Sequence, residues 1–589
     1  MSKKVSEILN SDIQVPEIVQ KKADVAFSQI QSERETNMSK KNLKFVSFIL
    51  AALCAIGFCS CGRNGGNAGP DYDDPTRNPF GKYETTVKIT GVMEYQAHND
   101  SRVPQSVTPD NQQFIKLMKE RLNLEFSYLW KVPPTQYSEK LSLSMLSNEL
   151  PDIFKVTASD YASLKKAGML KNLSTAYEYA SDDVKTFLNR DPDVIKRLTD
   201  ADGGIYAVPQ YSDNRRGVPV MYIRQDWLNE LKLSVPETPE ELYEVLKAFK
   251  QKKGATCGLA MSNAIAGSYF SIDRYMNVFG SSPYAWLLGS DGKLHADEVS
   301  ENSKTALKWL NKLYNEGILT KDVAAATVDA VQADVLGDKC GVVIGPWWQF
   351  EYPLGTAIGN DADWVAAKMP LAEGKNVVID RQQVEFYYVV NKKCRNPEAL
   401  FKMINMYIAL DGTPEAAPEN GYVWSWCPTQ FYDPYDINEQ YVNINKQLES
   451  DPKAEGEAPE TWTAHMKKLW NAYPEYLVWK ADHYATKYQE NMFANIMTRV
   501  NKDGAWAQIL KIYDDEKRVS YDEFYGISTP AMSSKGALMA QEVSEYYLKA
   551  IMGEKNIDAT WDSFVSSWKK IGGDEVAAEV NAWYAEQAK

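Results

Sequence analysis

The chain has 589 residues, of which 44% are hydrophobic, and a formal net charge of −14. This length is more than one hydrophobic core usually supports, so we expect two or three lobes, and the hydrophobic content is typical of a globular protein rather than a disordered one. The acidic balance continues beyond residue 61 and argues against nucleic acid as a partner, because nucleic-acid binding requires a basic surface.

The first recognisable element is a secretory signal that begins inside the chain. From Met38 the sequence reads MSKKNLKFVSFILAALCAIGFCSCGRNGG, with three lysines ahead of an apolar run from Phe45 to Phe58. This run has the length of a signal peptide and is too short for a comfortable membrane span. Small residues and Cys61 follow it, which resembles a bacterial lipobox. Cys61 is therefore the predicted lipidation site.

Two details of this segment leave alternatives open. A lipobox usually has Leu three residues before the modified cysteine, and here that residue is Phe58. Cys59 is a rival site, but the bulky Phe58 would then occupy the cleavage position, which favours Cys61. An ordinary transmembrane anchor is the other interpretation. We assign three N-terminal segments: 1–37 as a misannotated extension, 38–60 as a lipoprotein signal peptide and 61–83 as a flexible tether rich in Gly, Asn, Asp and Pro.

Alternating strands and helices follow the tether. Alternation of apolar and polar residues predicts strands, and apolar residues spaced three and four apart predict helices. In chain order these are a strand at 85–93, a helix from about 109, a strand at 123–130, a helix at 138–146 and a strand at 152–156. This order is typical of an α/β fold with a mainly parallel sheet.

The next segment carries the clearest local signals. Two strands, at 205–208 and 220–223, are joined by a polar link. Thr238 and Glu241 form a capping box with Pro239 at the first helical position, so a helix is expected at 240–249. The remaining predicted elements are a helix at 302–316, a strand at 341–344 running into Gly345-Pro346-Trp347-Trp348, a strand at 385–391, a helix at 397–409 and a mostly helical tail from Lys535.

The sequence shows no motif for a metal, a cofactor or catalysis. The four cysteines beyond the signal, Cys257, Cys340, Cys394 and Cys427, are scattered singly without a CxxC pair. A zinc site is therefore unsupported, and both one disulfide and isolated buried thiols remain open. HExxH, GxSxG, Walker and GxGxxG motifs are absent. Because a carboxylate pair leaves no sequence signature, an exported glycoside hydrolase stays an alternative.

Several short motifs, each weak alone, form an ordered set along the chain. They are LPDIF at 150–154, GIYAVP at 204–209, YIRQDWL at 222–228, VPET at 235–238, LYNEG at 313–317, IMG at 551–553, FVSSWKKIGG at 564–573 and EVNAWY at 579–584. Over residues 84–589 this set resembles the extracellular solute-binding lipoproteins of carbohydrate ABC transporters, of the family 1, LplA-like type. Many relatives carry an acidic, calcium-type loop where this chain has FKQKKGAT at 249–256, so no metal is carried over.

The resemblance implies a type II periplasmic-binding-protein fold, in which a hinge joins two α/β lobes around a ligand cleft. Lobe 1 would begin with residues 84–210 and lobe 2 with 211–383, while 384–589 would complete both lobes and supply the C-terminal helices. The first crossing is expected near 209–220 and the return near 381–386.

The function that the resemblance implies is binding without catalysis or cofactor. A monomer, anchored by lipid at the extracellular face of a cell membrane, of the Gram-positive type, would capture an oligosaccharide by lobe closure and deliver it to the permease subunits of an ABC importer. A surface adhesin or sensor-input protein is the second hypothesis.

Sugar recognition pairs aromatic platforms with planar polar groups, which selects the candidate ligand contacts. Asp152 lies at a strand end, where a helix cap is the alternative, and Arg381 precedes the return strand, where a salt bridge is the alternative. One of Trp347 and Trp348 is expected in the core. The candidates from position are Glu94, Tyr95, Asp152, Tyr211, Trp347, Trp348, Arg381, Trp424 and Trp426. Four tryptophans at amphipathic helical positions are expected to be core residues: Trp227, Trp561, Trp568 and Trp583.

Overall fold

A computed structural model describes residues 77–97, 102–191, 194, 199, 203–381, 383–483, 486–526 and 528–587. All of them belong to one compact unit, Asp71–Lys589. Cys61, the signal peptide and the residues before Arg77 lie outside the described part, so the lipidation prediction is untested by it. Within the described ranges, no helix combines the length and apolar character that crossing a membrane requires.

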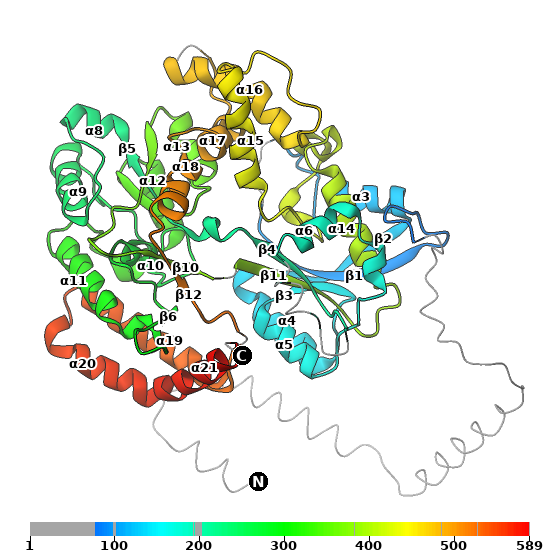
Figure 1. The fold of residues 1–589 in the computed structure, drawn as a ribbon, viewed down its shortest axis with the longest axis horizontal. Coiled ribbons are helices and arrows are strands. Elements are labelled where there is room, and N and C mark those ends of the chain that lie inside the picture. Colours follow the sequence, from blue (N-terminus) through cyan, green and yellow to red (C-terminus); the bar gives the residue numbers. More distant parts are fainter. Residues whose placement is uncertain are drawn as a thin grey trace, which may run out of the picture. The chain divides into compact units, whose positions relative to one another are not determined.

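The first group of elements packs around its own hydrophobic clusters (Figure 1). Its strands are β1 (Val87–Glu94), β2 (Leu124–Val132), β3 (Ile153–Val156), β4 (Val208–Ser212) and β11 (Gln383–Val390). Its helices are α3 (Gln113–Leu117), the π-helical turn η1 (Met118–Leu122), α4 (Pro134–Ser147), α5 (Ala158–Lys166), α6 (Asp182–Asn189) and α14 (Ala399–Leu410). β1 pairs in parallel with β2, whereas β11 lies between β3 and β4 and is antiparallel to both.

The second group surrounds a larger hydrophobic core. Its strands form an antiparallel sheet in the order β8-β5-β9, a parallel pair β10-β12 and a hairpin β6-β7. The strands are β5 (Val220–Arg224), β6 (Trp286–Leu288), β7 (Leu294–Ala296), β8 (Val342–Gly345), β9 (Trp364–Ala367), β10 (Val377–Asp380) and β12 (Val519–Asp522).

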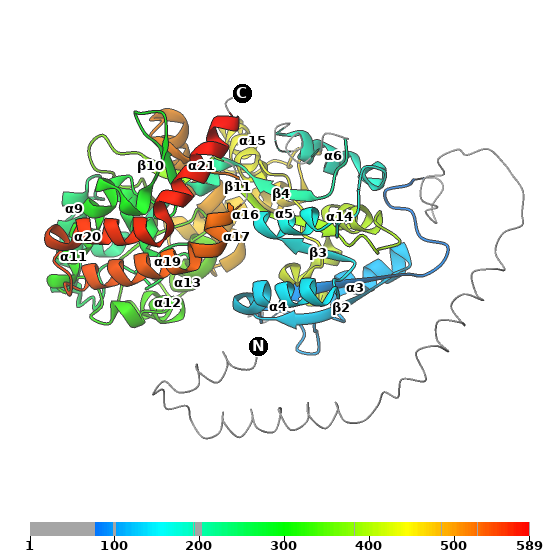
Figure 2. The ribbon, with the colours of Figure 1, turned by 90° about the horizontal axis from the view of Figure 1, so that it is seen from below.

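The helices of the second group come from the middle and the end of the chain. They are α8 (Gln225–Leu231), α9 (Pro239–Lys253), α10 (Ile272–Met276), α11 (Glu301–Asn315), α12 (Val328–Leu336), α13 (Gly355–Gly359), α15 (Asp436–Ser450), α16 (Ala464–Ala481), α17 (Glu490–Arg499), α18 (Ala505–Leu510), α19 (Pro530–Ile551), α20 (Ile557–Trp568) and α21 (Asp574–Gln587). Figure 2 shows the C-terminal helices α19 and α20 beside α11, against which they pack.

Helix α9 illustrates how local sequence sets an element. The Thr238 hydroxyl accepts a hydrogen bond from the Glu241 amide at 3.2 Å, and the Glu241 carboxylate accepts one from the Thr238 amide at 3.2 Å. Gly254 ends the helix with φ of 68°, a left-handed conformation that suits glycine. One face buries Leu242, Val245, Leu246 and Phe249. Each such side chain contributes about 1.5–3 kcal/mol on full burial, so the predicted helix is confirmed by both its cap and its core face.

Two sequence predictions about the first sheet need correction. The strand expected at 205–208 lies at Val208–Ser212, and Ile205 forms only an isolated bridge with Thr199. The prediction of a mainly parallel sheet is also wrong beyond the β1-β2 pair, because β3 and β4 both pair with β11 in antiparallel orientation. β11 comes from a distant part of the chain and inserts between them, which the local sequence pattern cannot indicate.

The four cysteines within the described ranges form one disulfide and two free thiols. Cys257 and Cys340 form a disulfide with a Cα–Cα distance of 5.1 Å, while Cys394 and Cys427 are free and buried. The disulfide joins the segment after α9 to the turn before β8. Of the four tryptophans expected in the core, Trp227, Trp561 and Trp568 are buried, and Trp583 is half-buried against Phe524 and Tyr525.

Candidate ligand-binding site

The chain passes between the two groups of elements at points that define a crossing edge. β4 ends at Ser212 and β5 begins at Val220, which pairs with Gly345 at the end of β8. β10 ends at Asp380, and β11 begins at Gln383, which pairs with Ser212. The ends of β8 and β10 and the start of β5 therefore lie at the crossing edge of the second group.

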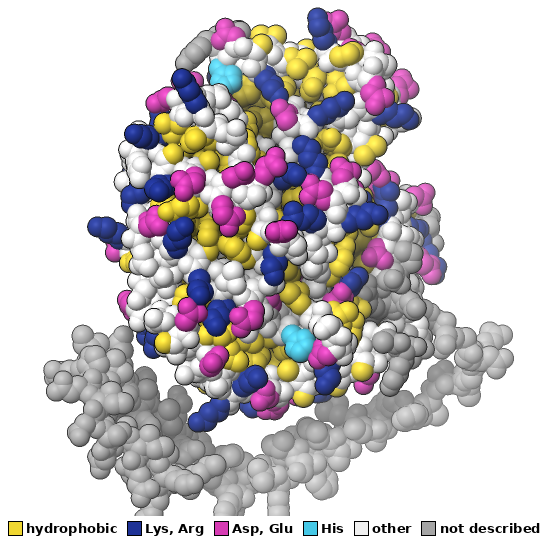
Figure 3. Space-filling view, turned by 60° about the vertical axis from the view of Figure 1, so that its left-hand side comes forward, with side chains coloured by type: hydrophobic (Ala, Val, Ile, Leu, Met, Phe, Trp, Pro, Cys, Tyr) yellow, Lys and Arg dark blue, Asp and Glu magenta, His cyan; other side chains and the backbone are white. Residues whose placement is uncertain are grey.

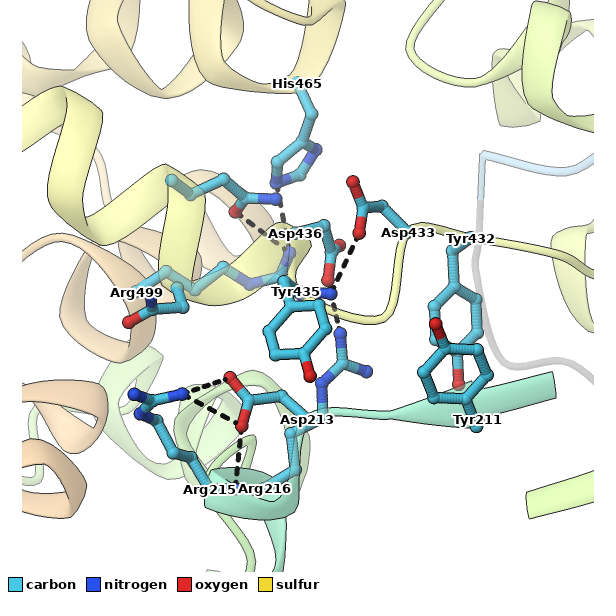
Figure 4. A network of polar contacts seen from close by, with 12 residues as sticks. Tyr211, Asp213, Arg215, Arg216, Tyr432, Asp433, Tyr435, Asp436, His465 and Arg499 are labelled. Atoms are coloured by element: carbon cyan, nitrogen blue, oxygen red, sulfur yellow. Dashed lines mark hydrogen bonds and ion pairs between the residues drawn. The ribbon is translucent and has the colours of Figure 1, made fainter. Parts of the chain in front are cut away.

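A polar pocket lies beside the first crossing. Its lining residues come from both groups and from the crossing itself: Asp191, Tyr211, Ser212, Asp213, Asn214, Arg215, Tyr435 and Tyr513. The buried Asp213 carboxylate accepts hydrogen bonds from the Arg215 amide at 3.0 Å and from its guanidinium at 3.0 Å (Figure 4). Arg215 also donates two 3.0 Å hydrogen bonds to Asp514. Burial raises the pKa of Asp213, and the contacts with Arg215 oppose that rise.

Arg216 makes a separate set of contacts. It forms an ion pair with Asp436 at the start of α15. Its guanidinium carbon lies 5.4 Å from the ring centre of Trp347 and 5.2 Å from that of Tyr432. The two consecutive arginines of the crossing, Arg215 and Arg216, thus form ion pairs with different carboxylates (Figure 4).

Trp347 lies between Arg216 and a second arginine. Arg499 on α17 binds Glu351 through two hydrogen bonds of 2.8 and 2.9 Å, and its guanidinium carbon lies 5.3 Å from the Trp347 ring centre. His465 lies 3.3 Å from Arg499, and burial together with the arginine charge lowers the pKa of His465 to about 3. The imidazole is therefore neutral at physiological pH, and the partly buried Trp347 ring lies between two arginines.

Trp348 has a different environment from its neighbour. It makes an edge-on contact with Tyr269 at 5.4 Å between ring centres, and Tyr269 makes another with Tyr352 at 6.3 Å. Trp348 and Tyr269 are half-buried, and Tyr352 is 38% exposed. This aromatic group, Tyr269-Trp348-Tyr352, presents apolar ring area to solvent, as a sugar platform requires.

The first group of elements contributes a second set of the predicted residues. Tyr95 stacks on Trp426 with ring centres 6.0 Å apart. Trp426 is buried and its indole donates to the Gln96 carbonyl at 2.9 Å, whereas Trp424 is 65% exposed. Glu94 forms an ion pair with Lys155. The structure therefore brings Glu94, Tyr95, Trp424 and Trp426 into one region.

Two predicted contacts, Tyr211 and Arg381, have clear structural partners. The Tyr211 hydroxyl donates to the Phe187 carbonyl at 2.6 Å and accepts from the Asp191 amide at 3.0 Å, although Tyr211 also lines the crossing pocket. Arg381 forms an ion pair with Glu523 and lies over the ring of Tyr521 at 4.4 Å.

Asp152 lies at the start of β3, which is the end farther from the crossing. Its carboxylate accepts from the Thr90 amide at 2.9 Å and from the Thr90 hydroxyl at 2.7 Å. These bonds tie β3 to β1, and Asp152 stands apart from the other predicted contacts.

Sequence reasoning missed several residues of this region. Arg215 and Arg216 were visible as charged residues in the polar link between two strands, which was a usable signal. Tyr269 and Arg499 carried no such signal, because the groups that they contact are far away in the chain.

Comparison with known proteins identifies the family. The chain matches the bacterial extracellular solute-binding proteins over residues 109–413, more than half of its length. It belongs to this family.

Curated relatives of this solute-binding protein include lipoprotein LipO of Bacillus subtilis, 28% identical over 243 residues, which are 40% of this chain and 47% of the relative. The fructooligosaccharide ABC transporter substrate-binding protein FusA of Streptococcus pneumoniae is 25% identical over 306 residues, 48% of this chain and 54% of the relative. The chain thus spans about half the length of the curated relatives it matches.

Solved structures show the fold of this solute-binding protein. The alginate-binding protein AlgQ2 without calcium superimposes with a TM-score of 0.56 and 17% identity, covering 87% of this chain and 99% of that one. FusA from S. pneumoniae in complex with fructo-nystose gives a TM-score of 0.56 and 16% identity, covering 86% and 99%. The predicted family and the predicted type II fold are confirmed.

The face of the molecule in Figure 3 carries charges of both signs. Figure 3 shows one face on which Lys and Arg alternate with Asp and Glu between small hydrophobic areas, without a broad basic region. That face lacks the basic surface on which nucleic-acid binding relies.

Proposed function

We propose that this protein captures an oligosaccharide between two lobes and delivers it to an ABC importer. The names of its relatives support the substrate class: one is a fructooligosaccharide-binding protein of an ABC transporter and another is a polygalacturonan/rhamnogalacturonan-binding protein of Bacillus subtilis, 29% identical over 247 residues. The family membership supports binding rather than catalysis, so we propose that the protein is not an enzyme.

The observation that carries this proposal is the partly exposed aromatic group at the crossing edge of the second core. Tyr269, Trp348 and Tyr352 offer ring faces on which the C–H groups of a sugar can stack. Trp424 and Tyr95 offer exposed aromatic area on the first group of elements. Rings on both sides of the crossing would give one ligand contacts with both lobes.

The mechanism that we propose is a shift in population toward a closed state. A ligand that touches both lobes gains its second set of contacts only on closure, and the shift is limited by its preference for the closed form. The separate hydrophobic cores on either side of residues 213–219 support the division into lobe 1 (84–210), lobe 2 (211–383) and a shared remainder (384–589). The permease subunits would then recognise the closed form.

We also propose that lipid on Cys61 holds a monomer at the extracellular face of the membrane. The lipobox-like sequence supports this, as does the lipoprotein LipO among the relatives. Mass spectrometry of the membrane-extracted protein should show a lipid-modified N-terminal cysteine, and a Cys61→Ser variant should be released from the membrane fraction. Membrane retention of the unmodified variant would contradict lipid anchoring.

A thermal-shift screen with defined mono- and oligosaccharides tests the main proposal. A ligand at about 100 times its dissociation constant should stabilise the fold by about 2.7 kcal/mol, which is visible as a rise in Tm. The same mixtures should show no new saccharide product after long incubation. Folded protein without a Tm shift for any sugar would contradict carbohydrate capture, and product formation would instead support a glycoside hydrolase.

A further inference from the structure

Arg274 lies at the crossing edge with an unsatisfied side chain. It belongs to α10, which packs against β8, and its backbone amide donates to the Ser271 carbonyl at 3.2 Å. Its Nε is buried and has no hydrogen-bond partner. Within the described ranges, no hydrogen bond or ion pair involves its guanidinium. An arginine with free donors beside a sugar platform is a group that a ligand can satisfy.

The nearest charges around Arg274 are carboxylates. Asp273 precedes it on α10, and Asp380 is the last residue of β10, at the crossing edge. The positive charge of Arg274 acts on both carboxylates and opposes the rise in their pKa values. Asp380 is paired in register with Asp522 at the end of β12. Burial raises the pKa of Asp380, and burial together with Asp380 and Glu523 raises the pKa of Asp522 to about 7. The other basic residue next to Asp380, Arg381, is already paired with Glu523.

The aromatic group lies on the same edge. Tyr269 precedes α10 by a few residues, and its carbonyl oxygen lies 3.3 Å from where a Cβ on Gly345, the last residue of β8, would be placed. Tyr269 also contacts Trp348 directly. Asp380 is the last residue of β10, and the side chain of Asn277, which directly follows α10, exchanges two hydrogen bonds with the Val378 backbone of that strand. α10 and β10 are drawn close together in Figure 1. The segments that carry Arg274 and Asp380 therefore pack against each other.

These groups suit an uncharged sugar. A sugar hydroxyl can donate to the Asp380 carboxylate and accept from the Arg274 guanidinium, so one ring with neighbouring hydroxyls can satisfy both. A uronic acid would instead add a carboxylate beside Asp273 and Asp380, the two carboxylates on which the charge of Arg274 acts. Like charges at short range in a partly desolvated site oppose its binding.

We propose that Arg274 and Asp380 form the polar half of a sugar subsite beside Tyr269, Trp348 and Tyr352, and that this subsite selects neutral oligosaccharides over uronic-acid oligosaccharides. The inference rests on the proposed function, because it names the substrate class of the same site. Neutral selection is not implied by the relatives, whose names include both fructooligosaccharide and polygalacturonan binders.

Titration calorimetry on the purified full-length protein tests the selection. The probes are neutral fructo-, gluco-, galacto-, manno- and xylo-tetrasaccharides, set against tetragalacturonate and tetramannuronate. We expect the best neutral probe to bind at least ten times more tightly than either uronic probe. A uronic probe that binds as tightly as the best neutral one overturns the inference and leaves carbohydrate capture standing. If neither set binds to folded protein, the proposed function fails and this inference fails with it.

Two substitutions test the residues. Arg274→Gln should weaken binding of the best neutral probe by roughly 10- to 100-fold, as expected for hydrogen bonds to a charged group. Asp380→Asn should weaken it too, and should also narrow the preference for neutral over uronic probes, because a repulsive charge is removed. A folding defect would lower the binding of both probe classes alike, so the change in preference separates the two explanations.

The matched control is Arg121→Gln, since Arg121 pairs with Glu415 on the surface of the first group of elements. It should leave binding of every probe unchanged. Unchanged neutral affinity in both Arg274→Gln and Asp380→Asn would overturn the assignment of the subsite.

Discussion

Arg216 forms an ion pair with Asp436, and this pair links the crossing between β4 and β5 to the first residue of α15. The Arg216 side chain is only 9% exposed and lies over two aromatic rings. Burial raises the pKa of Asp436, and the charge of Arg216 opposes that rise. The pair therefore fixes the polypeptide at a point where a hinge is proposed.

Arg216→Met should destabilise the protein by about 2 kcal/mol, because the Asp436 carboxylate would lose its partner in a poorly solvated place. Equilibrium denaturation with urea measures the loss. Arg121→Met, at an exposed ion pair, should change stability by less than about 0.5 kcal/mol. The double variant Arg216→Met/Asp436→Leu should recover part of the loss; equal stability of Arg216→Met and the native protein would contradict a structural role for the pair.

The Cys257–Cys340 disulfide closes a loop with a sequence separation of 83 residues. A loop of this size predicts a stabilisation of about 4 to 5 kcal/mol from the restricted unfolded state. Denaturing the exported protein without reductant and alkylating it should label Cys394 and Cys427 but not the bridged pair. Peptide mapping that finds label on Cys257 would contradict the disulfide. Reduction should lower Tm, whereas a Cys394→Ala variant should keep the effect of reduction unchanged.

The raised pKa of Glu298 predicts that the free energy of unfolding falls as pH rises. Burial raises the pKa of Glu298 to about 7, and the adjacent Asp297, whose own pKa is raised to about 6, adds to the rise. In the unfolded chain Glu298 would titrate near its usual range, so the folded protein binds the extra proton between about pH 5 and 7. The stability that this proton provides is complete below that window and is lost as pH rises through it.

Glu298→Gln should remove this loss. At pH 8 the variant should be more stable than the native protein by about 1 to 3 kcal/mol, and the difference should shrink toward pH 5. Thermal denaturation across this pH range measures it. Glu419→Gln, at an exposed position, should follow the native curve. A constant difference between Glu298→Gln and the native protein at every pH would show that Glu298 does not titrate in this window.

The sequence predicted the elements that depend on neighbouring residues. The capping box of α9, the strands at β1, β2, β3, β5 and β8, and the run into Trp347 and Trp348 all follow from local patterns. The polar link with Arg215 and Arg216 was predicted to hold the first crossing, and the structure places it between β4 and β5. In contrast, the charge of Arg274 acts on Asp380 only because two distant segments of the chain lie close together. The insertion of β11 between β3 and β4 has the same character, since pairing partners far apart in the chain leave no periodic signal.

Asp152 is predicted to act on stability rather than on ligand affinity. Asp152→Ala removes two hydrogen bonds from Thr90 and should cost about 1 to 3 kcal/mol of unfolding free energy. The affinity for the best sugar found in the thermal-shift screen should stay within about twofold. Asp110→Ala, whose carboxylate pairs with Lys131 on the surface, is the control and should change neither quantity. A large loss of affinity with unchanged stability would instead make Asp152 a ligand contact.

Substitutions of the two neighbouring tryptophans should have different effects, Trp347 mainly on stability and Trp348 mainly on sugar affinity. Trp347 packs against Arg216, Arg499 and the edge of Trp506, so Trp347→Ala should destabilise the fold by about 2 kcal/mol. Trp348 contacts Tyr269 at the partly exposed aromatic group, so Trp348→Ala should weaken sugar binding about tenfold with a smaller change in stability. Trp348→Phe should restore part of the affinity, because a ring face is retained. If Trp347→Ala lost affinity and Trp348→Ala did not, the sugar platform would have to be assigned to Trp347.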